Sequence, residues 1–192
     1  MQIDLLQATE DDLPIVRNLV SYYVYEISGP MGWECNAEGV FGGCDDLAES
    51  WRTNHPETPL EDQWPEPKWR GYPFVIRADH LTAGFVLVKQ YGERAEPSYD
   101  MSEFFVLRQY QRQGVGQAAA CEAFDQFRGL WEVRQLLQNT PAVAFWRKAI
   151  GAYTGGRFSE VQEEMPHYGI EMNFRVYEIV CVNGLLILGE SP

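Results

Sequence analysis

The sequence predicts a single domain of the α/β (α+β) class, and three observations support this fold class. A strand-like run at 102–107 leads through a glycine-containing turn into a helix-like run at 118–127. Two strand-like runs, 72–78 and 82–90, are separated by a short turn and indicate a hairpin. A chain of 192 residues fits one domain and is long enough to bury a hydrophobic core.

The first elements are a strand and an amphipathic helix. Residues 2–8 alternate well enough for a strand. The helix is expected to start near Asp11, because acidic residues favour a helix N-terminus and Pro14 must lie in the first turn or so. Gly29-Pro30 is expected to end it. Its apolar face recurs at helical spacing, at Leu13, Val16, Leu19, Val20 and Tyr23.

The stretch 28–71 is predicted to be an insertion between the first helix and the hairpin. It begins with a glycine-rich irregular segment and includes a short helix at 45–54. Four prolines and two tryptophans in 56–71 exclude regular secondary structure there. This loop is either a lid over a substrate site or a packed insertion.

The remaining elements alternate between strand and helix patterns: a strand at 99–107, the helix at 118–127, a strand at 131–138 and a helix after Asn139. A strand near 157–161 follows, bounded by Gly155-Gly156 and by 163–169. Asn183-Gly184 lies between two strand-like runs and predicts a C-terminal hairpin in 172–192. This hairpin either covers an edge of the sheet or extends it into a homodimer.

Composition and charge exclude several classes of protein. The net charge of −13 argues against a nucleic acid or an anionic membrane as the partner. No run approaches the roughly 20 apolar residues of a membrane span, and no secretory signal is apparent. The four cysteines lack the spacing of a metal site, so we expect no metal, reduced thiols and a cytoplasmic protein.

The acidic residues are concentrated in one segment. Between Glu26 and Glu66 there are ten acids and one base, Arg52. This segment is either a solvated surface or an electrostatic funnel that attracts a cationic ligand.

The glycine-containing turn has the features of a phosphate-binding loop. Backbone N–H groups at a helix N-terminus have no partner within the helix, and the helix dipole places partial positive charge there. Gly114 and Gly116 lack the Cβ atoms that would keep a pyrophosphate away. Arg108 and Arg112 add cations near the turn. In the dinucleotide-binding fingerprint, the third glycine would fall where this chain has Ala119. The P-loop would require a Gly-Lys-Ser/Thr ending, which is absent.

Two motifs carry a resemblance to a known family. Gln111, Gly114 and Gly116 match the pattern Q/R-x-x-G-x-G/A, which resembles the acetyl-CoA signature of the GNAT superfamily of N-acetyltransferases. Residues 139–148 are similar to its second motif, N-x-x-A-x-x-F-aromatic-x-K/R. The motifs occur in the family's order with one strand between them, and the resemblance covers about residues 2–178.

Within the superfamily, the runs at 103–108, 145–148 and 153–158 resemble a group of predicted bacterial acetyltransferases of unassigned substrate. Membership implies a mixed, mostly antiparallel sheet with flanking helices, in which a central strand–helix–strand unit binds acetyl-CoA. It also implies that 28–71 lies on the acceptor side of the domain.

The resemblance implies that acetyl-CoA is the acyl donor. A bulge in the strand would direct backbone groups of Val106, Leu107 and Arg108 at the pantetheine arm. The pyrophosphate would lie against Gln111, Arg112, Gln113, Gly114, Val115, Gly116, Gln117 and Ala118. Asn139 and Phe145 would contact the pantetheine region, unless Asn139 only caps the next helix and Phe145 only packs in the core.

The reaction implied is direct transfer of an acetyl group to an amine within a ternary complex. The acidic segment favours a small cationic acceptor. The acceptor site would be lined from the end of the first helix by Tyr22, Tyr23, Tyr25 and Glu26. The alternatives are peptide or protein N-acetylation and a non-catalytic acyl-CoA-binding regulatory module.

Glu103 is the first candidate for the catalytic base or the anchor of the amine, because it interrupts an apolar strand and burial would raise its pKa. The alternative is a salt bridge to a neighbouring strand. Strict alternation places it on the opposite face from Asp100, the second candidate base. Many family members have a tyrosine where this chain has Trp146, whose indole supplies no titrating proton. Tyr153 is then the candidate acid, unless the thiolate leaves unassisted.

Overall fold

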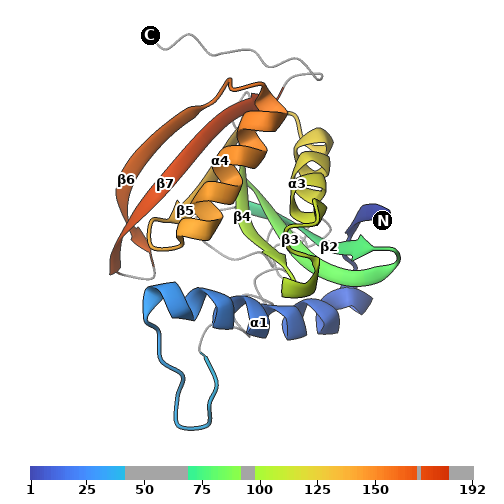
Figure 1. Ribbon diagram of the computed structural model, residues 1–192, viewed down its shortest axis with the longest axis vertical. Coiled ribbons are helices and arrows are strands. Elements are labelled where there is room, and N and C mark those ends of the chain that lie inside the picture. The colour runs from blue at the N-terminus through green and yellow to red at the C-terminus, as the bar shows by residue number, and fades with distance from the viewer. Residues whose placement is uncertain (42–68, 92–97, 168–169, 182–192) are drawn as a thin grey trace.

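The computed structural model describes residues 1–41, 69–91, 98–167 and 170–181. Its seven strands form one sheet in the order β1-β2-β3-β4-β5-β7-β6 (Figure 1). Strands β4 and β5 are parallel, and the other neighbouring pairs are antiparallel. The strands are β1 (Ile3–Gln7), β2 (Trp69–Ala78), β3 (Leu81–Tyr91), β4 (Ser98–Val106), β5 (Gly129–Leu136), β6 (Ser159–His167) and β7 (Ile170–Cys181). The predicted mixed, mostly antiparallel sheet is confirmed.

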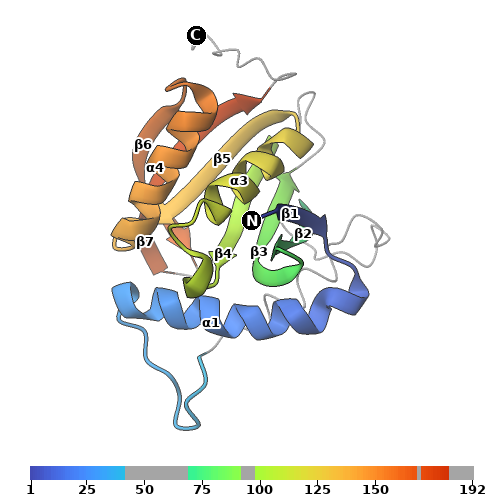
Figure 2. The ribbon, with the colours of Figure 1, turned by 45° about the vertical axis from the view of Figure 1, so that its right-hand side comes forward.

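Helices cover both faces of this sheet. The helices are α1 (Leu13–Met31), α3 (Val115–Gln126) and α4 (Thr140–Thr154), with short 3-10 helices at Glu10–Asp12 and Arg108–Tyr110. Helix α1 packs on one face through Val16 and Val20, beside Phe85. Helices α3 and α4 lie side by side on the other face (Figures 1 and 2), over a larger core that includes Phe124 and Trp131.

Helix α1 is longer than the sequence predicts. It continues through Gly29-Pro30 and ends at Met31, before Gly32, whose φ is +66°. A proline in the last turn removes only one helical hydrogen bond, and the Ser28 hydroxyl donates to the carbonyl of Tyr25 at 2.7 Å in the same turn. The additional turn brings Pro30 to the edge of the cleft described below.

Three other boundaries differ from the prediction. Strand β2 begins at Trp69, inside the predicted loop, because its first residues pair with the end of β3. Strand β6 continues through 163–167, because it pairs along that length with β7. Helix α3 begins at Val115, three residues earlier than expected, directly after the glycine turn. Pairing and packing with other elements thus override the local turn signals.

The predicted helix at 45–54, most of the loop at 56–71 and the turn at Asn183-Gly184 lie outside the described residues, as does most of the acidic segment. Within the described ranges, no helix is long and apolar enough to cross a membrane.

Candidate active site

The site begins where β4 and β5 separate. The two strands pair only from Ser98 with Leu130 to Asp100 with Glu132, whereas β5 pairs with β7 along its whole length. A cleft of about 900 Å³ lies at the end of β4. Its lining comes from the end of α1, the end of β4, the glycine turn and α4 as far as Ala149, and includes Tyr23, Glu26, Phe104, Val106, Gly114, Asn139, Phe145 and Trp146.

The glycine turn has the geometry of an anion site. Gly114 is the N-cap of α3 with φ of +85°, and its position has no side-chain cap hydrogen bond. The first N–H groups of α3 therefore remain available to an anionic ligand, and the helix dipole favours one there. Arg112 and Lys148 line the same cleft and supply positive charge. These residues fit the pyrophosphate of coenzyme A.

Some of the predicted phosphate-loop residues line the cleft, and others only hold the turn in place. Gln111 lines the cleft, but its side-chain amide donates to the carbonyl of Val106 at 2.9 Å and so ties the turn to the end of β4. The side chain of Gln113 donates to the carbonyl of Gln109, and Val115 is fully buried. Among the described residues, the cleft lining includes Arg112, Gly114, Gly116 and Gln117 but not Leu107, Gln113, Val115 or Ala118.

Gly116 has a packing role that the sequence did not reveal. A Cβ atom at this position would lie 3.2 Å from the ring of Phe145. That ring stacks on Phe104, with centroids 5.8 Å apart and an angle of 26°, and Phe104 also meets Trp146 edge-on at 5.0 Å. The absent side chain thus allows α3 to approach α4, and the three rings form an apolar wall for the cleft.

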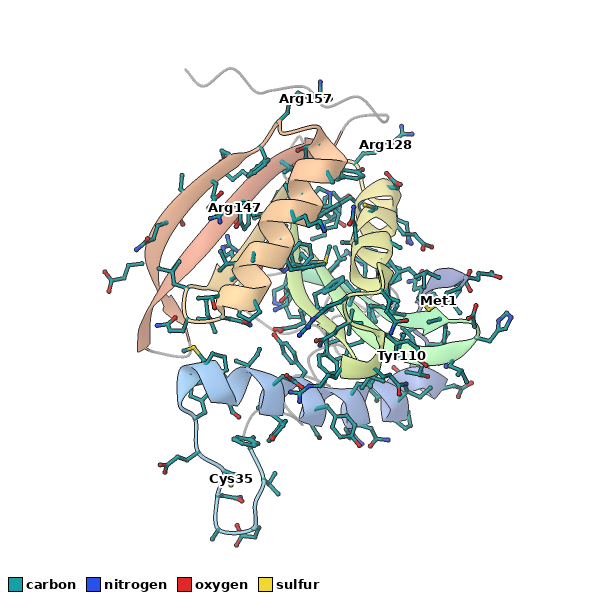
Figure 3. All side chains as sticks on the ribbon, viewed as in Figure 1. Met1, Cys35, Tyr110, Arg128, Arg147 and Arg157 are labelled. Atoms are coloured by element: carbon teal, nitrogen blue, oxygen red, sulfur yellow. The ribbon has the colours of Figure 1, made fainter. Side chains whose placement is uncertain are left out.

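Asn139 caps α4 and also lines the cleft. Its Oδ1 accepts a hydrogen bond from the backbone N–H of Ala142 at 3.3 Å. Phe145 likewise both packs and lines the cleft. The two interpretations that the sequence left open for each residue are therefore compatible. On the next turn of α4, Lys148 lines the cleft, whereas Arg147 extends toward β6 (Figure 3) and contacts Glu160 at 2.5 Å.

A bulge in β4 changes which face of the sheet its side chains lie on, compared with the strict alternation expected from the sequence. Leu87 pairs with Glu103, but the next residue, Val88, pairs with Met101, so Ser102 is the extra residue. One inserted residue shifts the alternation of side chains by one position. Asp100 and Glu103 therefore lie on the same face of β4, the face covered by α1, and the prediction of opposite faces was wrong. The bulge at Ser102 lies just before the run 103–108, in which the family resemblance implied it.

Asp100 is the centre of a buried ionic group. Its Oδ2 lies 2.8 Å from Nη1 of Arg134, which also contacts Glu132. Burial raises the pKa of Asp100, and Arg134 and Lys89 oppose that increase. The hydroxyl of Tyr91 hydrogen-bonds the same carboxyl group, and burial together with the negative charge of Asp100 raises the pKa of Tyr91 to about 12.

Glu103 has a different environment on the same face. The hydroxyl of Tyr23 donates a hydrogen bond to its Oε2. Burial raises the pKa of Glu103, whereas the Tyr23 hydrogen bond and then Lys89 lower it. Glu103 is therefore a carboxyl group with an elevated pKa near the point where the strands separate, as a general base requires.

The structure does not bring all predicted acceptor residues together. Glu26 lines the cleft and forms an ion pair with Arg108, with 2.8 Å between Oε1 and Nη2. Tyr22 and Tyr25 are exposed, and neither is among the described residues that line the cleft. The ring of Tyr25 lies 6.4 Å from that of Phe41.

Tyr153 is not at the cleft. It lies near the C-terminal end of α4, where its hydroxyl donates to Asp125 at 2.8 Å and its ring packs on Phe124. The cleft is lined by the other end of α4, from Thr140 to Ala149. The arrangement thus gives no support to Tyr153 as the acid.

Gln135 is a residue that sequence reasoning missed. It is 6% exposed on the α4-facing side of β5, and within the described part of the chain neither atom of its amide has a hydrogen-bond partner. A buried amide without partners carries a substantial desolvation cost. The only sequence signal was a polar residue on the face of the strand that also carries Trp131 and Val133, and many such residues are paired.

The sequence matches the acetyltransferase (GNAT) family model over residues 43–152. The structure is similar to a spermidine N-acetyltransferase from Vibrio cholerae solved with CoA and spermine (TM-score 0.59, 16% identity, 94% of this chain and 96% of that chain). It is also similar to the aminoglycoside N(6')acetyltransferase of Legionella pneumophila (0.63, 11%, 94% of each chain). The ribosomal-protein-S18-alanine N-acetyltransferase of Escherichia coli has a TM-score of 0.54 at 14% identity, over 100% of this chain and 99% of that one. A comparison with curated proteins gives no match.

The chain therefore belongs to the GNAT family of acetyltransferases. It is an N-acetyltransferase, and acetyl-CoA is its acyl donor. At these sequence identities the solved structures establish a common fold and leave the acceptor to be inferred from the site.

Proposed function

We propose that this protein transfers the acetyl group of acetyl-CoA to a primary amine of a small cationic acceptor, by direct attack in a ternary complex. The first turn of α3, with Arg112 and Lys148, would hold the pyrophosphate. The apolar wall of Phe104, Phe145 and Trp146 would hold the uncharged pantetheine arm. The acceptor would approach from the α1 side of β4, which carries the acidic side chains.

One observation carries the choice of a cationic acceptor. Asp100 and Glu132 are both ion-paired to Arg134, whereas the hydrogen-bond donor to Glu103 is the neutral hydroxyl of Tyr23. A substrate ammonium in the cleft would bring a cation near this carboxylate, which would then receive the proton that the amine loses. The net charge of −13 favours the approach of such a cation. The similar spermidine and aminoglycoside N-acetyltransferases are named for polycationic acceptors.

Two further features bear on the acceptor and on the reaction. The E. coli enzyme similar to this chain is named for an alanine of a ribosomal protein, which keeps protein N-acetylation as an alternative. The cleft has buried Trp146 in its wall, and Tyr153 lies away from it, so the two positions considered for a tyrosine acid give none. Without such a tyrosine, the thiolate of coenzyme A would leave unassisted or take its proton from water.

The proposal also places the enzyme in the cytoplasm. Within the described residues Cys35 and Cys121 are free thiols, which suits a reducing compartment. A homodimer through the C-terminal hairpin remains part of the proposal and is testable by sedimentation.

The test is thiol release from acetyl-CoA with a panel of polyamines, aminoglycosides and peptides. We expect release with a small polycation, and a decrease of about 100-fold or more for Glu103→Gln with unchanged acetyl-CoA affinity. The matched control is Glu10→Gln, an exposed glutamate in the turn before α1. Acetyl-CoA binding without release across the panel contradicts a small cationic acceptor. Release with peptides alone supports protein acetylation.

A further inference from the structure

Tyr23 connects the cleft to Glu103. Tyr23 is among the residues that line the cleft, while Glu103 is not among the described residues of that lining. The hydroxyl of Tyr23 donates its hydrogen bond to Oε2 of Glu103. One side chain therefore has contact with both the space for substrates and the carboxyl group that lies next to it.

The tyrosine is held in this position by two other rings. Its ring meets Phe85 edge-on, with centroids 5.6 Å apart and an angle of 81°. It also packs on Phe105 at 5.9 Å. Phe85 and Phe105 come from β3 and β4 and are themselves buried. An aromatic ring confined in this way has little rotational freedom, so its hydroxyl is fixed toward Glu103.

We propose that the hydroxyl of Tyr23 relays the proton of the acceptor amine from the cleft to the carboxylate of Glu103. The inference rests on the proposed function and adds a catalytic residue to it. The phenol oxygen accepts a proton from the substrate ammonium while the phenol proton passes to Oε2 of Glu103. The products of the step are a neutral amine, a protonated Glu103 and an unchanged tyrosine, so the step balances.

The relay avoids forming a tyrosinate. An unperturbed tyrosine has a pKa near 10, so a free tyrosinate would be costly at neutral pH, whereas concerted transfer leaves Tyr23 neutral before and after the step. The charged and titratable groups that act on Glu103 are Tyr23 on α1, Lys89 on β3 and Asp100 on β4. Tyr23 and Lys89 favour the carboxylate, and burial together with Asp100 opposes it. Because its pKa is raised by burial, this carboxylate accepts a proton more readily than an exposed glutamate does.

The test compares Tyr23→Phe, Glu103→Gln and the double variant. Phenylalanine keeps the ring contacts with Phe85 and Phe105 and removes only the hydroxyl. The matched control is Tyr72→Phe, which removes a hydroxyl that donates to Gln90 at 2.8 Å on another part of the sheet. The readouts are kcat, the KM of the amine, the affinity for acetyl-CoA and the pH dependence of kcat/KM, with spermidine as the first amine.

We expect Tyr23→Phe to lower kcat by about 100-fold with acetyl-CoA affinity within twofold of the wild type. The acid limb of its kcat/KM profile should move to higher pH, because the hydrogen bond that favours the carboxylate is lost. The double variant should be no slower than the slower single variant, since both changes interrupt one path. Tyr72→Phe should remain within twofold of the wild type.

Other outcomes overturn the relay. If Tyr23→Phe has wild-type activity and Glu103→Gln is inactive, Glu103 acts directly on the amine. That result leaves the proposed function intact. The effects of the two substitutions on kcat could instead multiply in the double variant. Together with an unchanged pH profile and a lower melting temperature, that result would give Tyr23 a structural role only. Absence of thiol release by the wild type with every amine overturns the proposed function, and the relay with it.

Discussion

Glu26 and Arg108 form an ion pair across the cleft, with 2.8 Å between Oε1 and Nη2, and so join α1 to the loop that precedes α3. The sequence predicted Arg108 at the cofactor and Glu26 at the acceptor. In the structure these two residues, expected on different substrates, bind each other. The side chain of Arg108 is 76% exposed, so the pair is a weak one that ligands can replace.

Glu26→Gln is expected to strengthen acetyl-CoA binding. The substitution frees Arg108 for the phosphates, and because an exposed pair of this kind is weak, the gain in affinity should be about fivefold at most. Calorimetric titration with acetyl-CoA at low and high salt measures the effect, which should shrink as salt rises. The control is Glu160→Gln, which breaks the ion pair with Arg147 outside the cleft. Unchanged or weaker binding by Glu26→Gln would show that Arg108 is not withheld from the cofactor.

Gly114→Ala is expected to weaken acetyl-CoA binding by about tenfold or more. The residue has φ of +85° and open space where a Cβ would lie, so an alanine meets no clash but adopts this φ only with a strain of roughly 1–2 kcal/mol. Relief of that strain would shift the turn that presents the first N–H groups of α3. Gly155→Ala is the matched control, because Gly155 also has a positive φ (+62°) and open space around it but lies at the other end of α4. Both variants should lose similar stability in urea unfolding, and only Gly114→Ala should lose affinity. Equal acetyl-CoA affinities for the two variants would show that this turn does not bind the phosphates of acetyl-CoA.

The carboxyl group of Glu103 is expected to make the protein less stable as pH rises. Its pKa is raised above 4.5 in the folded state, chiefly by burial, so the folded state binds its proton more tightly than the unfolded state does. The stabilisation is complete below the unfolded pKa and is lost as pH rises from about 4.5 through the folded pKa. Urea unfolding between pH 4 and 8 should therefore show a flatter dependence for Glu103→Gln than for the wild type. Glu10→Gln should reproduce the wild-type slope, and a wild-type slope for Glu103→Gln would contradict the raised pKa.

The sequence correctly predicted a glycine turn between a strand and a helix at Gly114, and its binding of phosphate stays a prediction. It could not predict the bulge at Ser102, because nothing in the run from Asp100 to Phe105 marks an extra residue, and the bulge depends on how β4 pairs with β3. For that reason the shared face of Asp100 and Glu103 was missed. The placement of Tyr153 could have been predicted: eight residues after Phe145 on one helix put it about 12 Å along the axis, away from the cleft.

Gln135→Met is expected to stabilise the ligand-free protein. The amide of Gln135 is buried without a hydrogen-bond partner in the described part of the structure, and such a group costs about 1–3 kcal/mol. Methionine has a similar length and flexibility and no polar atom to desolvate, so it should fill the same space. Urea unfolding should show a gain of about 1 kcal/mol or more, and the matched variant is Gln126→Met, at an exposed position of α3. A loss of stability in Gln135→Met would show that the amide has a partner, and acetyl-CoA titration of the same variant would show whether that partner is the bound cofactor.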